Sequence, residues 1–188
     1  MTQTRKMAYV AILGSISFLL MFFSFAIPFG GVTFLKVEFS IIPILIGLVI
    51  MDTPGAICVL VMRSLLKLLL NNTGVETYIG LPMNMLMVLT FILAFAWIWK
   101  KQQTKVRFIL AGTIGTIGAT LLMLALNLFY AIPLYATFAN FDIAKVFGVG
   151  SYLATAVLPF NLLQGVLYVG AFAMILGVMQ PVLKRYEK

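Results

Sequence analysis

The stretch Leu35-Lys36-Val37-Glu38-Phe39-Ser40 is a polar interruption in a sequence that is otherwise 63% hydrophobic. It follows a long apolar run and a turn-forming segment, Ile27-Pro28-Phe29-Gly30-Gly31. In an extended chain, alternate side chains point to opposite sides, so Lys36 and Glu38 would share one side. A loop that only joins two membrane helices needs no such alternation. We therefore predict that this hexamer is the lid of a small-molecule site.

The composition on either side of the hexamer is that of a membrane protein. Only 10% of the 188 residues are charged, and the mean hydropathy is +1.12. Soluble domains carry about 25% charged residues. We predict an all-α integral membrane protein in which residues 1–188 form a single transmembrane domain.

Six apolar runs predict six transmembrane helices, at about 7–27, 41–51, 56–70, 81–99, 106–131 and 154–183. The first run is longer than the apolar core of a signal peptide, so we expect an uncleaved helix. The second run, 41–51, is short, since a crossing needs about 20 residues, and it either crosses or forms a re-entrant segment. The turn-forming residues Asp52-Thr53-Pro54-Gly55 follow it.

Basic residues predict the orientation. With the N-terminus inside, the inner segments hold Arg5, Lys6, Lys100, Lys101, Lys105, Arg107, Lys184, Arg185 and Lys188, and the outer segments hold Lys36 and Lys145. Lys and Arg are concentrated in the cytoplasmic loops of membrane proteins. We therefore expect a multi-pass protein of the bacterial cell membrane with both termini cytoplasmic and the 35–40 loop outside. The same rule explains the net charge of +8 without nucleic acid.

Carboxamide side chains lie near the outer ends of three predicted helices. They are Asn84, Asn127, Asn161 and Gln164. Asn161 and Gln164 are three residues apart and share one helical face. A carboxamide both donates and accepts hydrogen bonds, so the set suits an uncharged ligand with mixed polar edges. Hydrogen bonding between helices is the alternative for any single one of them.

Aromatic and basic residues lie near the same level. Phe34, Phe39, Tyr78, Tyr130 and Phe160 could sandwich a flat ring, or could form an interfacial belt. Arg63 and Lys67 are four residues apart and share a helical face. They either serve the site, as we predict for Lys67, or pair with Glu38, Asp52 or Glu76 to stabilise the fold.

The sequence argues against catalysis. There is no histidine, and the one cysteine, Cys58, lies in an apolar run. This removes histidine-based metal sites and general-base chemistry, and Glu38 and Glu76 form no evident acid–base pair. No phosphate-binding Gly-x-x-x-x-Gly-Lys motif is present, so any use of ATP must lie in a partner. We predict neither an enzyme nor a cofactor.

Three segments resemble a known family. They are Lys36-Val-Glu-Phe-Ser, then Leu-Leu-Lys67-Leu-Leu-Leu-Asn-Asn-Thr-Gly-Val-Glu76, then Pro159-Phe-Asn-Leu-Leu-Gln-Gly. Together with the length and the six-helix layout, they resemble the riboflavin-binding S-components of energy-coupling factor (ECF) vitamin transporters. The resemblance implies an outward-facing pocket formed by the first loop and the outer ends of helices four to six. It also implies riboflavin as the transported ligand, and as partners a transmembrane coupling subunit and two cytosolic ATPases.

The resemblance further implies that small residues on the first helix dock the coupling subunit, which here would be Ala8, Ala11 and Ser15. The family pattern is not matched throughout: Ile12 follows four residues after Ala8, and Gln164 stands where a lysine is expected. Two alternatives stay open, an S-component for another vitamin such as thiamine and a self-sufficient transporter. Thiamine binders place tryptophan against a cationic ring, whereas both tryptophans here lie near the predicted inner end.

Overall fold

The protein is a bundle of long helices, seen in a computed structural model that describes residues 1–186, with side chains placed through Met179. The helices are α1 (Gln3–Leu20), α2 (Ile41–Leu70), α3 (Val75–Ala94), α4 (Lys105–Leu126), α5 (Ile132–Phe138), α6 (Ile143–Phe147), α7 (Val149–Tyr152) and α8 (Leu158–Tyr186). Three π-helical turns continue or join them: η1 (Phe95–Trp99), η2 (Asn127–Ala131) and η3 (Leu153–Val157). Of the predicted inner basic residues, Lys188 lies outside the described residues.

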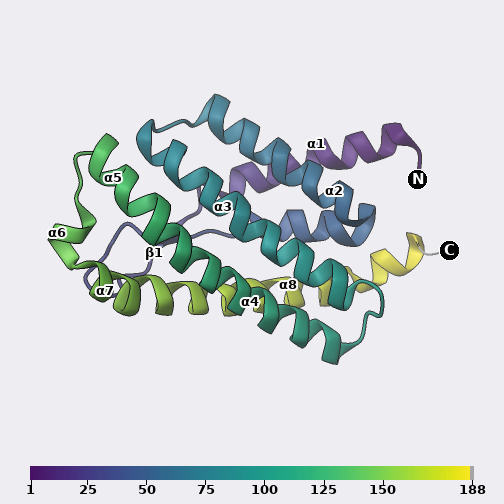
Figure 1. The fold of residues 1–188 in the computed structure, drawn as a ribbon. Helices are drawn as coiled ribbons and strands as arrows, with labels where there is room; N and C mark the ends of the chain where they lie inside the picture. The colour runs from purple at the N-terminus through teal and green to yellow at the C-terminus, as the bar shows by residue number, and fades with distance from the viewer. Residues whose placement is uncertain (187–188) are drawn as a thin grey trace.

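Figure 1 shows α5, α6 and α7 gathered at one end of the bundle and both chain ends at the other. We call these the α6 end and the terminal end. Within the described residues, four helical stretches are long and apolar enough to cross a membrane. They are Ile41–Leu70, Val75–Trp99, Lys105–Phe138 and Val149–Met179.

Helix α1 ends at Leu20, seven residues before the predicted boundary at 27. The chain then forms strand β1 (Phe25–Ala26), which pairs antiparallel with β2 (Lys36–Val37). Ile27 N–H donates to the Leu35 carbonyl at 3.2 Å. A residue that precedes proline avoids the helical region, and Ile27 precedes Pro28. The apolar run therefore predicted an end for this helix that is too far along the chain.

Helix α2 covers both predicted segments, 41–51 and 56–70, and it turns back on itself at Asp52. Asp52 has non-helical backbone angles, φ 64° and ψ −174°. The Lys100 ammonium donates to the carbonyls of Leu48 (2.9 Å) and Val49 (2.6 Å), and lies 3.1 Å from the Asp52 carboxylate. These contacts satisfy carbonyls that the end of the first leg leaves without helical partners. The predicted turn at Asp52 is thus present, with a lysine of another helix holding it.

The other long helices extend beyond their predicted bounds. Helix α3 begins at Val75 rather than at about 81, after Gly74, whose φ of 74° suits glycine. The helical stretch from Lys105 runs to Phe138 rather than to about 131. Pro133 does not break this stretch, because the π-turn η2 precedes it and already interrupts the regular hydrogen bonds. The last stretch begins at Val149 rather than at about 154.

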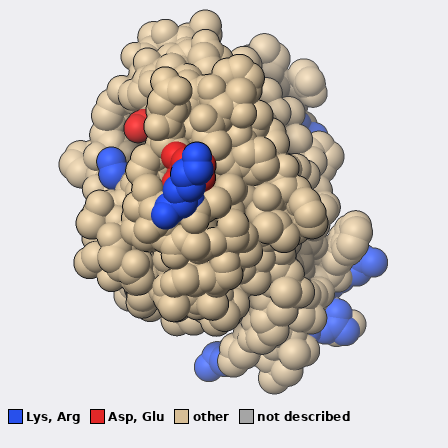
Figure 2. Space-filling model, turned by 60° about the vertical axis from the view of Figure 1, so that its left-hand side comes forward, with Lys and Arg blue, Asp and Glu red and all other residues tan. Residues whose placement is uncertain are grey.

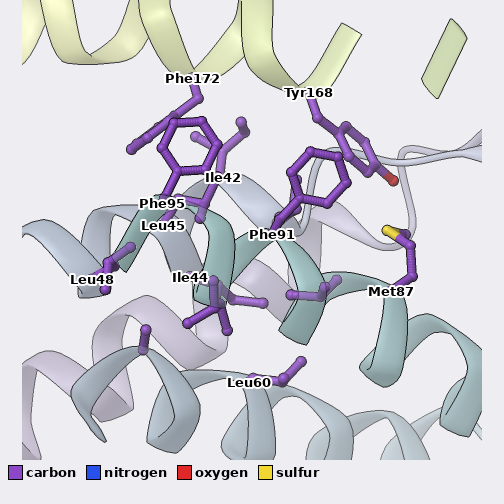
Figure 3. Close-up of a cluster of buried hydrophobic side chains, with 14 of the residues drawn as sticks. Ile42, Ile44, Leu45, Leu48, Leu60, Met87, Phe91, Phe95, Tyr168 and Phe172 are labelled. Carbon is purple, nitrogen blue, oxygen red and sulfur yellow. The ribbon is translucent and has the colours of Figure 1, made fainter. Parts of the chain in front are cut away.

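The first leg of α2 lies at the centre of the hydrophobic core. Ile44 and Leu48 are fully buried, and they belong to one cluster with Phe91, Phe95 and Phe172. Figure 3 shows these side chains converging from α2, from α3 with η1, and from α8. The shortest predicted membrane segment is therefore the one that protein surrounds most completely.

Close helix contacts depend on glycine. A Cβ on Gly14 would lie 2.8 Å from Cγ of Met62, so α1 packs tightly on the second leg of α2. Between α4 and α8, a Cβ on Gly112 would lie 2.7 Å from Cγ1 of Val169. Small residues allow such backbone approach where lipid supplies no hydrophobic driving force.

Candidate functional site

Arg63 anchors the 35–40 loop inside the bundle. Its guanidinium, fully buried, donates from Nη1 to Ser40 Oγ at 2.6 Å and from Nη2 to Asn84 Oδ1 at 2.8 Å. The Glu38 carboxylate Oε1 lies 3.6 Å from Arg63 Nη1 and accepts from Ser40 Oγ at 2.8 Å. Ser17 Oγ of α1 donates to the Ser40 carbonyl at 2.5 Å. We call Glu38, Ser40, Arg63 and Asn84 the loop anchor.

Within the loop anchor the charge of Arg63 is paired with Glu38, one of the carboxylates proposed as its partner. Two of its atoms remain unused: Glu38 Oε2 and Arg63 Nε are buried and have no hydrogen-bond partner in the structure. In native proteins most buried polar atoms have a hydrogen-bond partner. A buried atom without one either lowers the stability of the fold or marks a place where a ligand or water binds.

A cavity of 230 Å³ adjoins the loop anchor. Lys36, Glu38, Lys67, Glu76 and Asn84 line it, with further residues of α3 and of the segments that follow α1 and α2. The Lys67 ammonium donates to Asn71 Oδ1 of its own helix end. Ligand pockets usually measure about 300–1,000 Å³, so this cavity alone is small for a drug-sized molecule.

A second group of predicted residues lies on η2 and α8, which contribute no described residue to the lining of this cavity. Asn127, Asn161 and Gln164, which we call the carboxamide group, are all buried. Asn127 accepts from the Tyr152 hydroxyl at 2.9 Å and donates to the Met123 carbonyl at 2.8 Å. Asn161 donates to the Val157 carbonyl at 2.8 Å, while its Oδ1 is buried without a partner.

Tyr168 of α8 connects the two groups. Its hydroxyl accepts a hydrogen bond from Gln164 Nε2 at 2.8 Å and lies beside Glu38 and Arg63. Its ring packs edge-on against Phe39 of the loop, with centroids 6.3 Å apart. The loop, the loop anchor and Gln164 thus meet at one tyrosine, which Figure 3 shows projecting from α8 toward Phe91.

An aromatic cluster packs the segment between β1 and β2 against the α6 end. Phe34 packs against Phe141, Phe147 and Tyr152, with centroid distances of 5.9, 6.4 and 6.2 Å. Helix α6 is capped by Asp142, which accepts from the Lys145 N–H at 3.1 Å. The N–H and ammonium of Lys145 lower the pKa of the Asp142 carboxyl.

The remaining predicted site residues lie in positions less suited to contact with a ligand. Tyr78 is 60% exposed, and its carbonyl accepts from the Tyr130 hydroxyl at 3.3 Å. Phe160 is buried in the main core rather than beside the aromatic cluster. Leu35 contacts the hydrophobic clusters on both sides of the loop. Asn84 lies with the loop anchor and not with the other three carboxamides.

Sequence reasoning missed Tyr152, Tyr168 and Ser17. Tyr152 and Tyr168 are single aromatics in apolar helices, and Ser17 resembles any small helix-packing residue. The spacing between Gln164 and Tyr168 was the one available signal, since residues four apart share a helical face.

The small residues Ala8, Ala11 and Ser15 lie on the exposed face of α1. Gly14, Ser17 and Phe18 instead face the bundle. Internal packing of α1 thus uses other positions, and the small-residue stripe is left uncovered in this chain.

Comparison with known proteins agrees with this architecture. Residues 5–176 match the family described as the substrate-specific component of ECF transporters. The riboflavin transporter RibU of Streptococcus thermophilus is 52% identical over 97% of this chain and 86% of its own length. RibU of Leuconostoc mesenteroides is 40% identical, over 99% and 96%.

A solved structure of the S component of a bacterial ECF transporter superposes with a TM-score of 0.78. It is 26% identical, and the match covers 97% of this chain and 99% of the other. The family is one of transporter components, not of enzymes. The chain therefore belongs to the substrate-specific components of ECF transporters, among their RibU members.

Proposed function

We propose that this protein is the riboflavin-binding membrane subunit of an ECF importer, and that it binds the vitamin between the 35–40 loop and the outer helix ends. The observation that carries the proposal is the 52% identity to a riboflavin transporter, RibU, over 97% of the chain. The unpaired atoms Glu38 Oε2 and Asn161 Oδ1 support the location. The alternative of a thiamine subunit is not favoured, because buried Trp99 packs among Phe95, Phe108 and Phe172.

The chemistry of the vitamin fits the residues assigned to the site. The isoalloxazine ring is flat and uncharged, and its polar edge carries an imide N–H between two carbonyls. Carboxamides match such an edge because they both donate and accept. We assign ligand contacts to Leu35, Lys36, Glu38, Phe39, Ser40, Lys67, Tyr78, Asn84, Asn127, Tyr130, Phe160, Asn161 and Gln164. Asn161 is the strongest of these, because a ligand N–H would satisfy its unpaired Oδ1.

Replacing Asn161 by leucine is expected to weaken riboflavin binding by roughly tenfold to a hundredfold. A buried hydrogen-bonding group of the ligand left unpaired costs about 1–3 kcal/mol. Quenching of flavin fluorescence on titration of the purified protein measures the affinity. Leu162→Ala is the matched control, because Leu162 is the partly exposed neighbour. Unchanged affinity in both Asn161→Leu and Asn127→Leu would remove the carboxamide group from the site.

We further propose six membrane segments with both termini in the cytoplasm and the α6 end outside. The fold supports an even number of crossings, since both chain ends lie at the terminal end in Figure 1. The two legs of α2 count as separate segments that turn at Asp52. Figure 2, with the α6 end turned forward, shows a largely uncharged face with one mixed acidic and basic cluster near its middle. Basic residues concentrate at the terminal end instead, which is typical of the cytoplasmic side.

A cysteine at Thr33 is expected to react with a membrane-impermeant thiol reagent in intact cells. Thr33 is exposed in the loop between β1 and β2. The experiment needs a Cys58→Ser background, because Cys58 is also exposed. Gln102→Cys, an exposed position between η1 and α4, is the control and is expected to react only after lysis. The reverse labelling pattern would place the loop in the cytoplasm and reject the orientation.

The partners proposed are a transmembrane coupling subunit and two cytosolic ATPase subunits. The exposed small residues Ala8, Ala11 and Ser15 support a docking surface on α1, because they permit close approach of another helix. Nothing in the sequence resembles a phosphate-binding loop, so energy for uptake has to come through such partners.

A further inference from the structure

The terminal end of the bundle contains a hollow larger than the one beside the loop anchor. It has a volume of 420 Å³, and we call it the inner groove. Val49 and Trp99 line it from α2 and η1, Phe108 from α4, and Leu176 from α8. Lys105 lies among its lining residues, at the start of α4. None of the residues assigned to riboflavin lines it.

The groove exists because α4 and α8 lose close contact toward this end. Nearer the middle of the bundle, Gly112 is tightly packed against Val169. Two turns further along α8, a Cβ on Gly177 would have no atom within 4 Å. Ala173, one turn before Gly177, is exposed as well. Small residues on α8 thus leave open space where larger ones would close the bundle.

The surface around the groove is apolar. Ile109 is 64% exposed beside it, and Val106 is 67% exposed on the same helix. Trp97, at the end of the neighbouring helix, is 70% exposed, as is typical of residues at a membrane interface. Since this chain is a membrane protein, the medium that meets such a surface is lipid. An unfilled apolar groove would forfeit the dispersion contacts of its walls.

One rim of the groove is polar and positively charged. Gln103, Thr104 and Lys105 contribute to it. Among the residues with described side chains, Lys105 forms no ion pair. The nearby carboxylate, Asp52, is already paired with Lys100. The positive charge at the rim is therefore not neutralised by these carboxylates.

An apolar groove with a basic rim at interfacial depth matches one kind of molecule. We propose that the inner groove binds an anionic phospholipid, with an acyl chain against Phe108 and Leu176 and the phosphate at Lys105. A zwitterionic phospholipid offers the same chains but no net charge to this rim. The proposal requires only that the chain lies in a membrane, and it goes beyond riboflavin binding.

The two tryptophans allow a direct test, because Trp99 lines the groove and Trp97 does not. Trp97→Phe leaves Trp99 as the only tryptophan. This variant is reconstituted without flavin into phosphatidylcholine vesicles that contain a small fraction of brominated phosphatidylglycerol or of brominated phosphatidylcholine. Bromine quenches tryptophan at close range. One basic residue near a membrane surface gives about a fivefold preference for anionic lipid, so brominated phosphatidylglycerol is expected to quench several times more efficiently.

Two changes in this background separate the rim from the groove. Lys105→Gln is expected to make the two brominated lipids quench equally. Gly177→Leu is expected to reduce quenching by both, because its side chain fills the open space. Gly170→Leu is the matched control and is expected to change nothing, since Gly170 also has open space but does not line the groove.

Three results would overturn the proposal. Equal quenching by both lipids before any rim substitution would show no headgroup preference. No quenching by either would mean that the groove is closed or filled by protein, and unchanged quenching in Gly177→Leu would mean that lipid reaches Trp99 elsewhere. Riboflavin titrations of the same variants report folding and test the proposed function separately, because a protein that bound no flavin could still show the lipid preference.

Discussion

Ala11→Trp is expected to abolish riboflavin uptake in cells that supply the ATPase and coupling subunits, while riboflavin binding by the purified protein stays unchanged. Ala11 is exposed on α1, whereas Gly14, about one turn further along, is buried against Met62. A tryptophan there would hold a docking helix away, since close approach in lipid depends on small residues. The change lies about 14 Å below the end of α1, by helix rise. Binding and uptake of the same variant are the two measurements.

Ile16→Trp is the matched control for Ala11→Trp. Ile16 is exposed on the same helix but points to a different side, and it already carries a large side chain. We expect it to retain both binding and uptake. Normal uptake in Ala11→Trp would place the docking surface elsewhere. Loss of binding together with uptake would contradict the separation of docking from the ligand site.

Arg63→Met is expected to destabilise the protein by about 3–5 kcal/mol, because it leaves the Glu38 carboxylate buried without its counter-charge. The free energy of unfolding of a folded protein is typically about 5–15 kcal/mol, so this loss is a large fraction of it. Riboflavin binding is expected to fall as well, since Ser40 and Asn84 lose their bonds to the guanidinium. The unfolding temperature in detergent and flavin titration measure the two effects.

A second substitution distinguishes charge pairing from simple loss of packing. Glu38→Gln combined with Arg63→Met removes both charges and is expected to recover much of the lost stability. Arg107→Met is the control, because Arg107 forms no ion pair among the described side chains. An unfolding temperature of Arg63→Met equal to that of the unsubstituted protein would show that the loop anchor does not stabilise the fold.

Hydropathy predicted the positions of the apolar segments well, and their ends poorly. It placed the start of α2 at Ile41 and the turn at Asp52, where composition changes sharply. It extended α1 to Ile27, because a two-residue strand such as Phe25–Ala26 is as apolar as the helix before it. It ended the helical stretch that begins at Lys105 before Pro133, because a π-turn that accommodates proline leaves no mark in a hydropathy profile.

The sequence indicated which residues belong to the candidate site better than it indicated which of them lie together. Charge inside an apolar helix marked Arg63 and Lys67, since such residues are costly in a membrane. The sequence could not decide which charges pair, because Arg63 meets Glu38 only after α2 turns back at Asp52. Asn84 looked equivalent to Asn161 by depth, yet its partner is the Arg63 guanidinium. Depth orders residues along a helix, whereas rotation about the helix selects their neighbours.

The first leg of α2 has a consequence for how the protein is made. Its eleven residues, Ile41–Met51, rise about 16 Å, roughly half of a hydrocarbon core about 30 Å thick. A segment this short is a poor candidate for stable insertion on its own. In the finished protein Ile44 and Leu48 are enclosed by side chains, including Phe172 of α8. Because α8 follows the other described helices in the chain, the centre of the bundle is completed only after all of them have been synthesised.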